Sequence, residues 1–276
     1  MEPNVDREVI EGFGDEWSRF DQSGLSKKDQ ENVFNAYFSI FPWQVLPEGA
    51  VGFDLGCGSG RWARMVAPRV GELHCIDPSV AALDVAQRNL KDQHNCRFHL
   101  AGVDDIPLED GSADFGYSLG VLHHVPDTEM GLKSCVAKLK RGAPFLLYLY
   151  YRFDNRPWWF KLLWRTSEIG RFLISRAPHP VRYLLSQVIA ITVYLPLSRF
   201  SLLLEKFGFN VDYVPLSSYR NRGFYVLRTD ALDRFGTKLE KRFTKDEIWR
   251  MMERAGLQKI VFSDTSSPWC ALGYKK

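Results

Sequence analysis

Three glycines at alternate positions follow a short apolar run and a carboxylate near residue 54. The segment carries Asp54, Gly56, Cys57, Gly58 and Gly60. Glycine reaches positive φ and lets the backbone approach a ligand closely. A helix that begins directly after such a loop directs its free N–H groups and the positive end of its dipole at the same place. The order strand, glycine loop, helix therefore predicts a site for a nucleoside-type cofactor.

The spacing of the acidic residues indicates which cofactor. The loop reads Gly-x-Gly-x-Gly, whereas dinucleotide sites favour Gly-x-Gly-x-x-Gly. A carboxylate two residues before the first glycine suits the ammonium and sulfonium of S-adenosylmethionine (SAM) better than a pyrophosphate. Asp77 ends the next predicted strand, 23 residues after Asp54, where a carboxylate accepts hydrogen bonds from both ribose hydroxyls. Pro78 then opens the following helix. The alternative is a glycine-rich turn that binds nothing.

The same residues resemble a known family. The Asp54 to Gly60 stretch resembles motif I of the class I SAM-dependent methyltransferases. Residues 110–127, with Asp-Gly-Ser-Ala-Asp-Phe and Leu-His-His-Val-Pro-Asp, are similar to the small-molecule enzymes of the ubiquinone/menaquinone group. Leu-Lys-Arg-Gly-Ala at 139–143 replaces the usual Leu-Lys-Pro-Gly-Gly. The similarity spans about residues 50 to 150 and implies SAM as cofactor and S-adenosyl-L-homocysteine as product.

The resemblance also implies an adenine-binding segment at residues 101–108. Gly102 stands where an aspartate is usual, so Asp104 or Asp105 takes the adenine amino group and Val103 offers its backbone N–H to the ring. Solvated loop acids are the alternative. The predicted cofactor-binding set is Asp54, Gly56, Cys57, Gly58, Gly60, Asp77, Pro78, Val103, Asp104 and Leu119.

A histidine pair follows the fourth predicted strand, where the transferable methyl group should lie. An imidazole is the natural general base near neutral pH, which makes His123 the predicted catalytic residue. Phosphoethanolamine methyltransferases resemble this stretch and use a histidine here. The alternative is a pair that closes a turn by hydrogen bonds. The predicted substrate-binding residues are Tyr37, His124, Arg222 and Tyr225.

Arginines lie among aromatic residues at 219–230. Three arginines in this stretch could clamp a phosphate or a carboxylate. The same set could equally form the polar edge of a strand.

The elements that would position these residues alternate regularly. Strands are predicted at 51–54, 72–77, 96–101, 113–119 and 143–151, and helices at 60–67, 79–90 and 128–139. A helix at 244–255 and strands at 257–262 and 269–274 complete the pattern. It predicts an α/β, doubly wound, Rossmann-like and mostly parallel sheet of seven strands. The resemblance implies that the last strand is antiparallel. We expect an N-terminal helical lid at 1–50, a SAM-binding core at 51–151 and 243–276, and a mostly helical substrate cap at 152–242.

The predicted cap is apolar and basic. Residues 156–206 contain eight Lys and Arg but only two acids, Glu168 and Glu205. The longest uncharged run, 183–198, has 16 residues, fewer than the roughly 20 that cross a membrane. Two alternatives remain: a buried cap helix, or an amphipathic surface at 157–206 that contacts anionic membrane peripherally.

Net charge, cysteine count and the composition of the first residues exclude some classes of function. A net charge of +3, with no Asn/Asp-Pro-Pro-aromatic motif, argues against nucleic acid. Five scattered cysteines and a polar, acidic start suggest a cytoplasmic protein without metal or disulfides. We expect a SAM-dependent methyltransferase with a small-molecule or lipid-linked acceptor, such as a secondary metabolite, a sugar or glycan, or an isoprenoid. The rivals are a non-catalytic SAM-binding or membrane-associated partner protein and, less in keeping with the glycine spacing, a nicotinamide oxidoreductase. No feature of the sequence indicates an oligomeric state.

Overall fold

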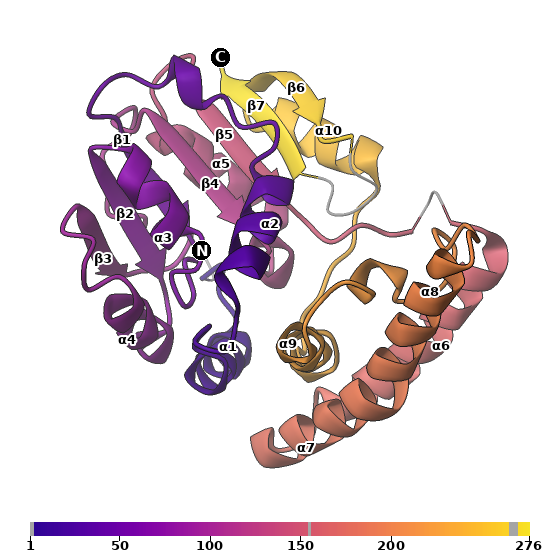
Figure 1. The fold of residues 1–276 in the computed structure, drawn as a ribbon. Coiled ribbons are helices and arrows are strands. Elements are labelled where there is room, and N and C mark those ends of the chain that lie inside the picture. Colours follow the sequence, from indigo (N-terminus) through magenta and orange to yellow (C-terminus); the bar gives the residue numbers. More distant parts are fainter. Residues whose placement is uncertain (1–2, 154–155, 265–269) are drawn as a thin grey trace. The chain divides into compact units, whose positions relative to one another are not determined.

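Seven strands form one sheet with the order β3-β2-β1-β4-β5-β7-β6 (Figure 1). The computed structural model describes residues 3–153, 156–264 and 270–276. The strands are β1 (Val51–Leu55), β2 (Glu72–Asp77), β3 (Cys96–Leu100), β4 (Phe115–Leu119), β5 (Pro144–Tyr148), β6 (Leu257–Phe262) and β7 (Cys270–Lys275). The first five pair in parallel, and β7 is antiparallel to both β5 and β6. The predicted doubly wound sheet with an antiparallel last strand is confirmed.

The helices associated with this sheet begin at residues that cap them. Ser79 and Asp127 accept hydrogen bonds from the first turns of their helices, and Thr244 and Glu247 form a capping box. The helix predicted at 60–67 is shorter and continues as a 3₁₀ turn. The elements are α1 (Arg7–Arg19), α2 (Lys27–Tyr37), η1 (Trp43–Val45), α3 (Ala63–Val66), η2 (Ala67–Arg69), α4 (Val80–Asn89), η3 (Leu122–His124), α5 (Thr128–Lys138) and α10 (Lys245–Arg254).

Alternate side chains of each strand pack into two different cores, because successive residues of a strand point to opposite faces. On β5, Leu146 faces a core shared with α2, α3 and α4. Its neighbours Phe145 and Leu147 face a second core shared with α5 and α10. Both faces of the central strands are buried, which explains why β4 and β5 read as nearly unbroken apolar runs.

The chain divides into two compact units. The core unit comprises Met1–Gln22, Gln30–Arg152 and Leu239–Lys276, and the helical unit comprises Ser23–Asp29 and Phe153–Lys238. These boundaries differ from the predicted lid, core and cap mainly in placing the N-terminal helices α1 and most of α2 with the sheet. The roles of lid and substrate cap stay predictions.

The helical unit contains six helical segments in its described part. They are α6 (Trp158–Ile174), α7 (His179–Ile189), the π-helical segment η4 (Ala190–Tyr194), α8 (Leu195–Lys206), η5 (Ser217–Tyr219) and α9 (Phe224–Gly236). Segments α7, η4 and α8 run on as a single helix of 28 residues, His179–Lys206. We call this the long helix.

The suggestion that residues 219–230 form the polar edge of a strand is wrong, because most of them lie in α9. Leu227 and Ala231 are four residues apart and are both buried against Ala190 of the long helix. Between them, the Arg228 guanidinium donates hydrogen bonds to the Gln187 side chain (2.5 Å) and the Tyr183 hydroxyl (2.8 Å). Tertiary packing at helical spacing thus overrides the strand propensity of the aromatic residues.

Candidate active site

The glycine loop directly follows β1 and is fixed to β2. The backbone N–H groups of Gly56 and Cys57 both donate to the Ile76 carbonyl, at 2.8 and 3.1 Å. Gly58 has φ of +52°, and a Cβ there would lie 2.8 Å from the indole nitrogen of Trp17. A side chain at Gly58 would therefore be strained and would also collide with α1. Trp17, which the sequence analysis did not select, lies against the loop.

Asp54 is fully buried at the base of this loop. Neither carboxylate oxygen makes a hydrogen bond of normal geometry within the described residues. Burial raises the pKa of Asp54 to about 8, although the nearby Tyr117 hydroxyl favours the ionised form. A buried carboxylate without a partner is costly, so such a group calls for a ligand that pairs with it. The ammonium of SAM is a fitting partner.

Asp77 holds the loop against the start of α4. One carboxylate oxygen accepts from the Gly58 N–H and the other from the Ser79 N–H, both at 2.9 Å. Burial raises the pKa of Asp77 to about 6, and these two N–H groups limit the rise. Each carboxylate oxygen keeps a lone pair that can accept from a ribose hydroxyl. Pro78 lies between Asp77 and the α4 cap.

Replacing Asp77 tests the ribose assignment. Asp77→Ala should weaken SAM binding by about 1.5 to 3 kcal/mol, the scale of hydrogen bonds to a charged group. Wild-type affinity should also fall as the pH drops below about 6, because protonation removes the acceptor. Calorimetric titration of variants with native circular dichroism measures both effects. Unchanged affinity would remove Asp77 from the cofactor site.

The predicted adenine segment is covered by the start of the chain. Val103 is buried, whereas Asp104 is exposed and accepts a hydrogen bond from the Asn4 backbone N–H. The Asn4 side chain in turn exchanges hydrogen bonds with the Asp127 backbone, at 2.6 and 2.8 Å. A lone asparagine near a terminus carries no sequence signal, so this strap could not have been found from the sequence.

The predicted base lies just beyond β4. Leu119 ends the strand, and His123 follows in η3 with no exposed surface. Its ring centroid lies 3.9 Å from that of Tyr150 and 4.0 Å from that of His124. Neither ring nitrogen has a hydrogen-bond partner among the described residues. Burial, followed by His124 and Arg242, lowers the pKa of His123 well below 6.5, so the imidazole is neutral at pH 7.

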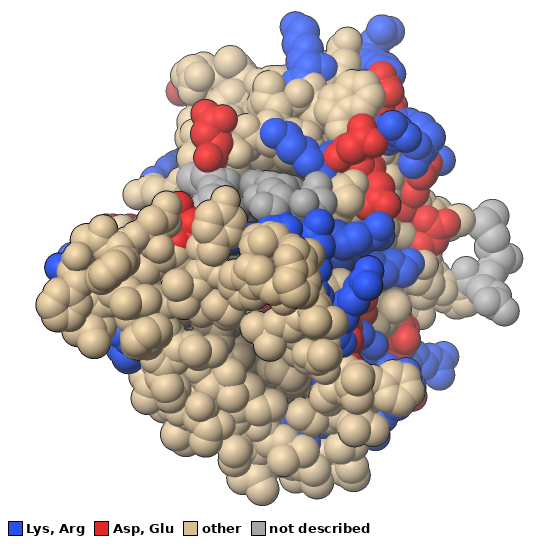
Figure 2. Space-filling view, turned by 90° about the vertical axis from the view of Figure 1, so that its right-hand side faces the viewer, with Lys and Arg blue, Asp and Glu red and all other residues tan. Residues whose placement is uncertain are grey.

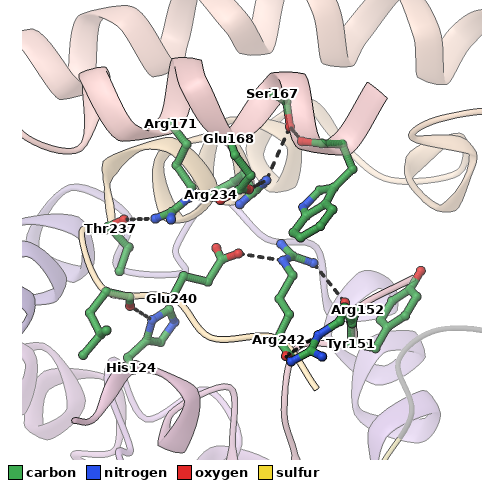
Figure 3. Close-up of polar contacts among 12 residues, drawn as sticks. His124, Tyr151, Arg152, Ser167, Glu168, Arg171, Arg234, Thr237, Glu240 and Arg242 are labelled. Atoms are coloured by element: carbon green, nitrogen blue, oxygen red, sulfur yellow. Dashed lines mark hydrogen bonds and ion pairs between the residues drawn. The ribbon is translucent and has the colours of Figure 1, made fainter. Parts of the chain in front are cut away.

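The neighbouring histidine is fixed differently. The Nδ1 of His124 donates to the Leu239 carbonyl at 2.7 Å (Figure 3). Arg242 follows on the same segment and binds Glu240 at 2.7 Å (Figure 3). Its guanidinium carbon lies 5.2 Å from the ring centroid of Tyr150. The segment after the helical unit thus returns to the histidine pair. Neither Arg242 nor Glu240 was selected from the sequence, because they join the site from more than 110 positions away.

Aromatic side chains surround the same strand ends. Tyr37 lies with its ring centroid 4.6 Å from Trp62 and 5.0 Å from Tyr148. Tyr148 is in turn 5.9 Å from Tyr150. We call Tyr37, Trp62, Tyr148 and Tyr150 the aromatic wall. Of these four, only Tyr37 was predicted; the two β5-end tyrosines could have been found as aromatic residues at the carboxyl end of a parallel strand.

The other two predicted substrate residues belong to the helical unit. The Tyr225 ring lies against Gly24, and the Arg222 carbonyl accepts from Arg199 at 3.2 Å. In the same stretch Arg220 forms an ion pair with Glu205 at 2.7 Å. The Arg220 and Arg228 side chains thus have partners within their own unit, and the role of Arg222 and Tyr225 in binding an acceptor stays a prediction.

Comparison with known proteins identifies the core unit. The family model described as "Methyltransferase domain" matches residues 53–147. Residues 53–147 thus form a SAM-dependent methyltransferase domain. The matched segment runs from β1 to β5 and includes the glycine loop, Asp77 and the histidine pair. The methyltransferase domain therefore contains all of the predicted cofactor and catalytic residues.

Curated relatives match the domain rather than the whole chain. Phosphoethanolamine N-methyltransferase 2 of Caenorhabditis elegans is 32% identical over 105 residues, which are 37% of this chain and 24% of that protein. Ubiquinone biosynthesis O-methyltransferase of Coxiella burnetii is 23% identical over 143 residues, 51% of this chain and 61% of the relative. The chain thus spans less than two thirds of the length of either relative.

A solved structure shows the same fold. Human N-acetylserotonin methyltransferase in complex with SAM superposes with a TM-score of 0.54 at 16% identity. The alignment covers 97% of this chain and 57% of that one. At this level of identity the likeness supports the fold alone.

Proposed function

We propose that this protein transfers a methyl group from SAM to a small-molecule or lipid-linked acceptor. The observation that carries the proposal is the buried Asp54 carboxylate, unpartnered beneath a glycine loop that Asp77 holds in place. When bound, SAM supplies an electrophilic methyl group on its sulfonium. The chain's own residues orient the two reactants and exclude water.

Each residue has a distinct part in this proposal. Asp54 pairs with the cationic end of SAM, Asp77 accepts from the ribose hydroxyls, and Val103 lies with the adenine. The neutral His123 imidazole accepts a proton if the acceptor must lose one, as a hydroxyl must. The aromatic wall favours an acceptor with an apolar or planar portion. The wall is close enough to His123, through Tyr150, to hold such an acceptor beside it.

The rival functions make different demands on the same site. A nicotinamide dinucleotide would place a pyrophosphate at the loop, where Asp54 offers that anion no positive charge in either protonation state. A non-catalytic SAM-binding protein would need Asp54 and Asp77 but not a neutral histidine beside the aromatic wall. The geometry therefore favours a catalyst over both rivals.

Ligand titration tests the cofactor directly. SAM and S-adenosyl-L-homocysteine should both bind in calorimetric titrations, and NAD should give no heat. SAM at a concentration of 100 times its dissociation constant should raise the free energy of unfolding by about 2.7 kcal/mol, which a thermal shift detects. Binding of NAD without binding of SAM would contradict the proposal.

The acceptor class needs a separate measurement. The protein is incubated with SAM labelled on its methyl group and with either a total lipid extract or a water-soluble metabolite extract. Label that partitions into the organic phase only with lipid extract supports a lipid-linked acceptor. Label that stays in the aqueous products limits the proposal to a soluble acceptor. SAM binding with no transfer to either extract would favour the non-catalytic rival.

A further inference from the structure

Two helices of the helical unit turn their apolar side chains to the outside. α6 exposes Leu162, Ile169 and Leu173 by 54%, 66% and 66%, and the long helix exposes Leu184, Ile191 and Leu203 by 62%, 54% and 50%. Figure 2 shows a broad area of uncharged side chains on the face turned to the viewer. We call the exposed apolar side of α6 and the long helix the apolar face. Monomeric soluble proteins seldom expose such a continuous patch.

The opposite side of the long helix is small and polar. The residues that it buries are Ser186, Ala190, Tyr194, Ser198 and Ser201. Their spacing of three or four residues places them on one side of the helix. A helix that packs in water buries leucines and exposes serines. The reverse arrangement is the one found where the surroundings are apolar and small residues let helices approach each other.

The inner side of α6 is charged. Glu168 forms ion pairs with Arg171 (2.9 Å) and with Arg234 of α9 (Figure 3). Arg171 also donates to the Thr237 carbonyl at 2.9 Å. These groups are less than one third exposed, whereas the leucines and isoleucine of the same helix face outward. Both helices therefore bury polar or charged side chains and expose apolar ones, the reverse of a helix that packs in water.

The length and charges of the two helices decide how they meet a bilayer. The long helix is long and apolar enough to cross a membrane, with a mean hydropathy of 1.5 and only 22% of its most apolar window buried. Its uncharged part, 183–198, is however about 24 Å long, short of the roughly 30 Å hydrocarbon core. α6 carries Lys161, Arg165, Glu168 and Arg171, so charges recur along its length. Helices with charges along one side lie in the interface rather than span it.

The net charge of residues 156–206 indicates which kind of lipid this segment would bind. Both acids of residues 156–206 are paired with arginines inside the helical unit, Glu168 with Arg171 and Glu205 with Arg220. The segment keeps an excess of six positive charges, eight Lys and Arg against two acids. Exposed Arg165 lies between Leu162 and Ile169 on the same side of α6, and exposed Arg176 follows the end of this helix. A basic apolar surface fits a bilayer that contains anionic lipid.

We infer that the apolar face of α6 and the long helix lies in one leaflet of an anionic lipid bilayer, parallel to its surface. The buried-cap alternative for this segment is not what the structure shows, because the large apolar side chains are exposed. The inference concerns the helical unit alone and holds whichever acceptor the methyltransferase domain uses. Each half-exposed leucine that enters the leaflet contributes roughly 1 kcal/mol, so a few together suffice for stable binding.

Vesicle flotation of the full chain tests the inference. The protein should float with vesicles of phosphatidylcholine and phosphatidylglycerol, and only weakly with phosphatidylcholine alone. Binding should weaken as salt is raised, without disappearing, because the apolar part is insensitive to screening. Leu173→Gln with Leu184→Gln should raise the lipid concentration for half binding at least ~10-fold, from about 1 kcal/mol lost at each site. Val45→Gln, at a residue 59% exposed in the core unit, is the matched control and should leave binding unchanged.

Two further measurements, of insertion depth and of self-association, distinguish the in-plane arrangement from a membrane-spanning helix and from a dimer. The fluorescence that Ile191→Trp adds, midway along the long helix, should be quenched more by lipids brominated near the headgroup than by lipids brominated near the chain end, because a helix that lies in the plane keeps its middle in the interface. Stronger quenching from the chain end would show spanning and overturn the in-plane arrangement. Sedimentation in lipid-free buffer gives the last outcome. A dimer that the paired substitutions dissociate, in a protein that ignores vesicles, would make the apolar face an interface between copies and overturn the inference.

Discussion

Asp54→Asn is expected to remove most of the SAM affinity and, at the same time, to make the unliganded protein more stable. The carboxylate is buried without a hydrogen-bond partner among the described residues. Loss of its pairing with a bound cation should reduce the binding free energy by about 1.5 to 3 kcal/mol, which raises the dissociation constant roughly 10- to 150-fold. The amide replaces a group that is expensive to bury, and so the fold itself gains.

The stability gain should depend on pH in a defined direction. The pKa of Asp54 is about 8 in the folded protein against 3.8 for an unperturbed aspartate. Between these values the folded protein holds a proton that the unfolded chain has released. The contribution of this group to the free energy of unfolding therefore has its largest value below about pH 4 and is lost as the pH rises to about 8. The advantage of Asp54→Asn should be small at pH 4 and should grow toward pH 8.

Two measurements check these effects. Thermal unfolding without SAM should place the variant several degrees above wild type at pH 7, since 1 kcal/mol shifts a protein of this size by roughly 2–4 °C. Calorimetry in buffers of different ionisation enthalpy should show that wild-type SAM binding releases a proton at pH 7. Asp84→Asn, at an exposed position on α4, is the matched control. A variant that binds SAM within about threefold of wild type would show that Asp54 is not the cation's partner.

His123→Ala is expected to lower the chemical rate by roughly 10²- to 10⁴-fold if the histidine removes a proton during transfer. SAM affinity should change little, because Asp54 and Asp77 lie at the glycine loop. The imidazole is neutral at pH 7, since burial lowers its pKa well below 6.5. The wild-type rate should therefore stay level through neutral pH and fall only at more acidic pH. The acid limb should be absent from the variant.

A second readout separates catalysis from packing. The unfolded chain takes up a proton on this histidine below pH 6.5, whereas the folded protein does not. Wild-type stability should fall as the pH drops below 6.5, and His123→Asn should lose that dependence whatever the role in catalysis. His94→Gln, at an exposed histidine, should keep both the rate and the pH profile. A folded His123→Asn that binds SAM and reacts at the wild-type rate would leave the histidine a packing role only.

The sequence by itself determined the sheet and the cofactor loop. Apolar runs with the right spacing predicted all seven strands, and the signal is strongest for β4 and β5, which are buried on both faces. Gly56, Gly58 and Gly60 were predicted as a loop since positive φ is a property of single residues. The helices predicted at 79–90 and 244–255 start at Ser79 and Thr244, whose side chains each bond to a backbone group three residues away, so these starts are local too.

The tertiary structure decided what depends on distant segments. Trp17, Asn4 and Arg242 reach the core site from both ends of the chain, and no local pattern marks them. Most of the stretch 219–230 lies in a helix because Leu227 and Ala231 pack on Ala190, a contact between segments that are far apart in the sequence. The direction in which the apolar sides of α6 and the long helix face is likewise decided by tertiary packing. Periodicity shows that a helix has two sides, but only the packing of the whole unit decides which side meets protein and which meets the surroundings.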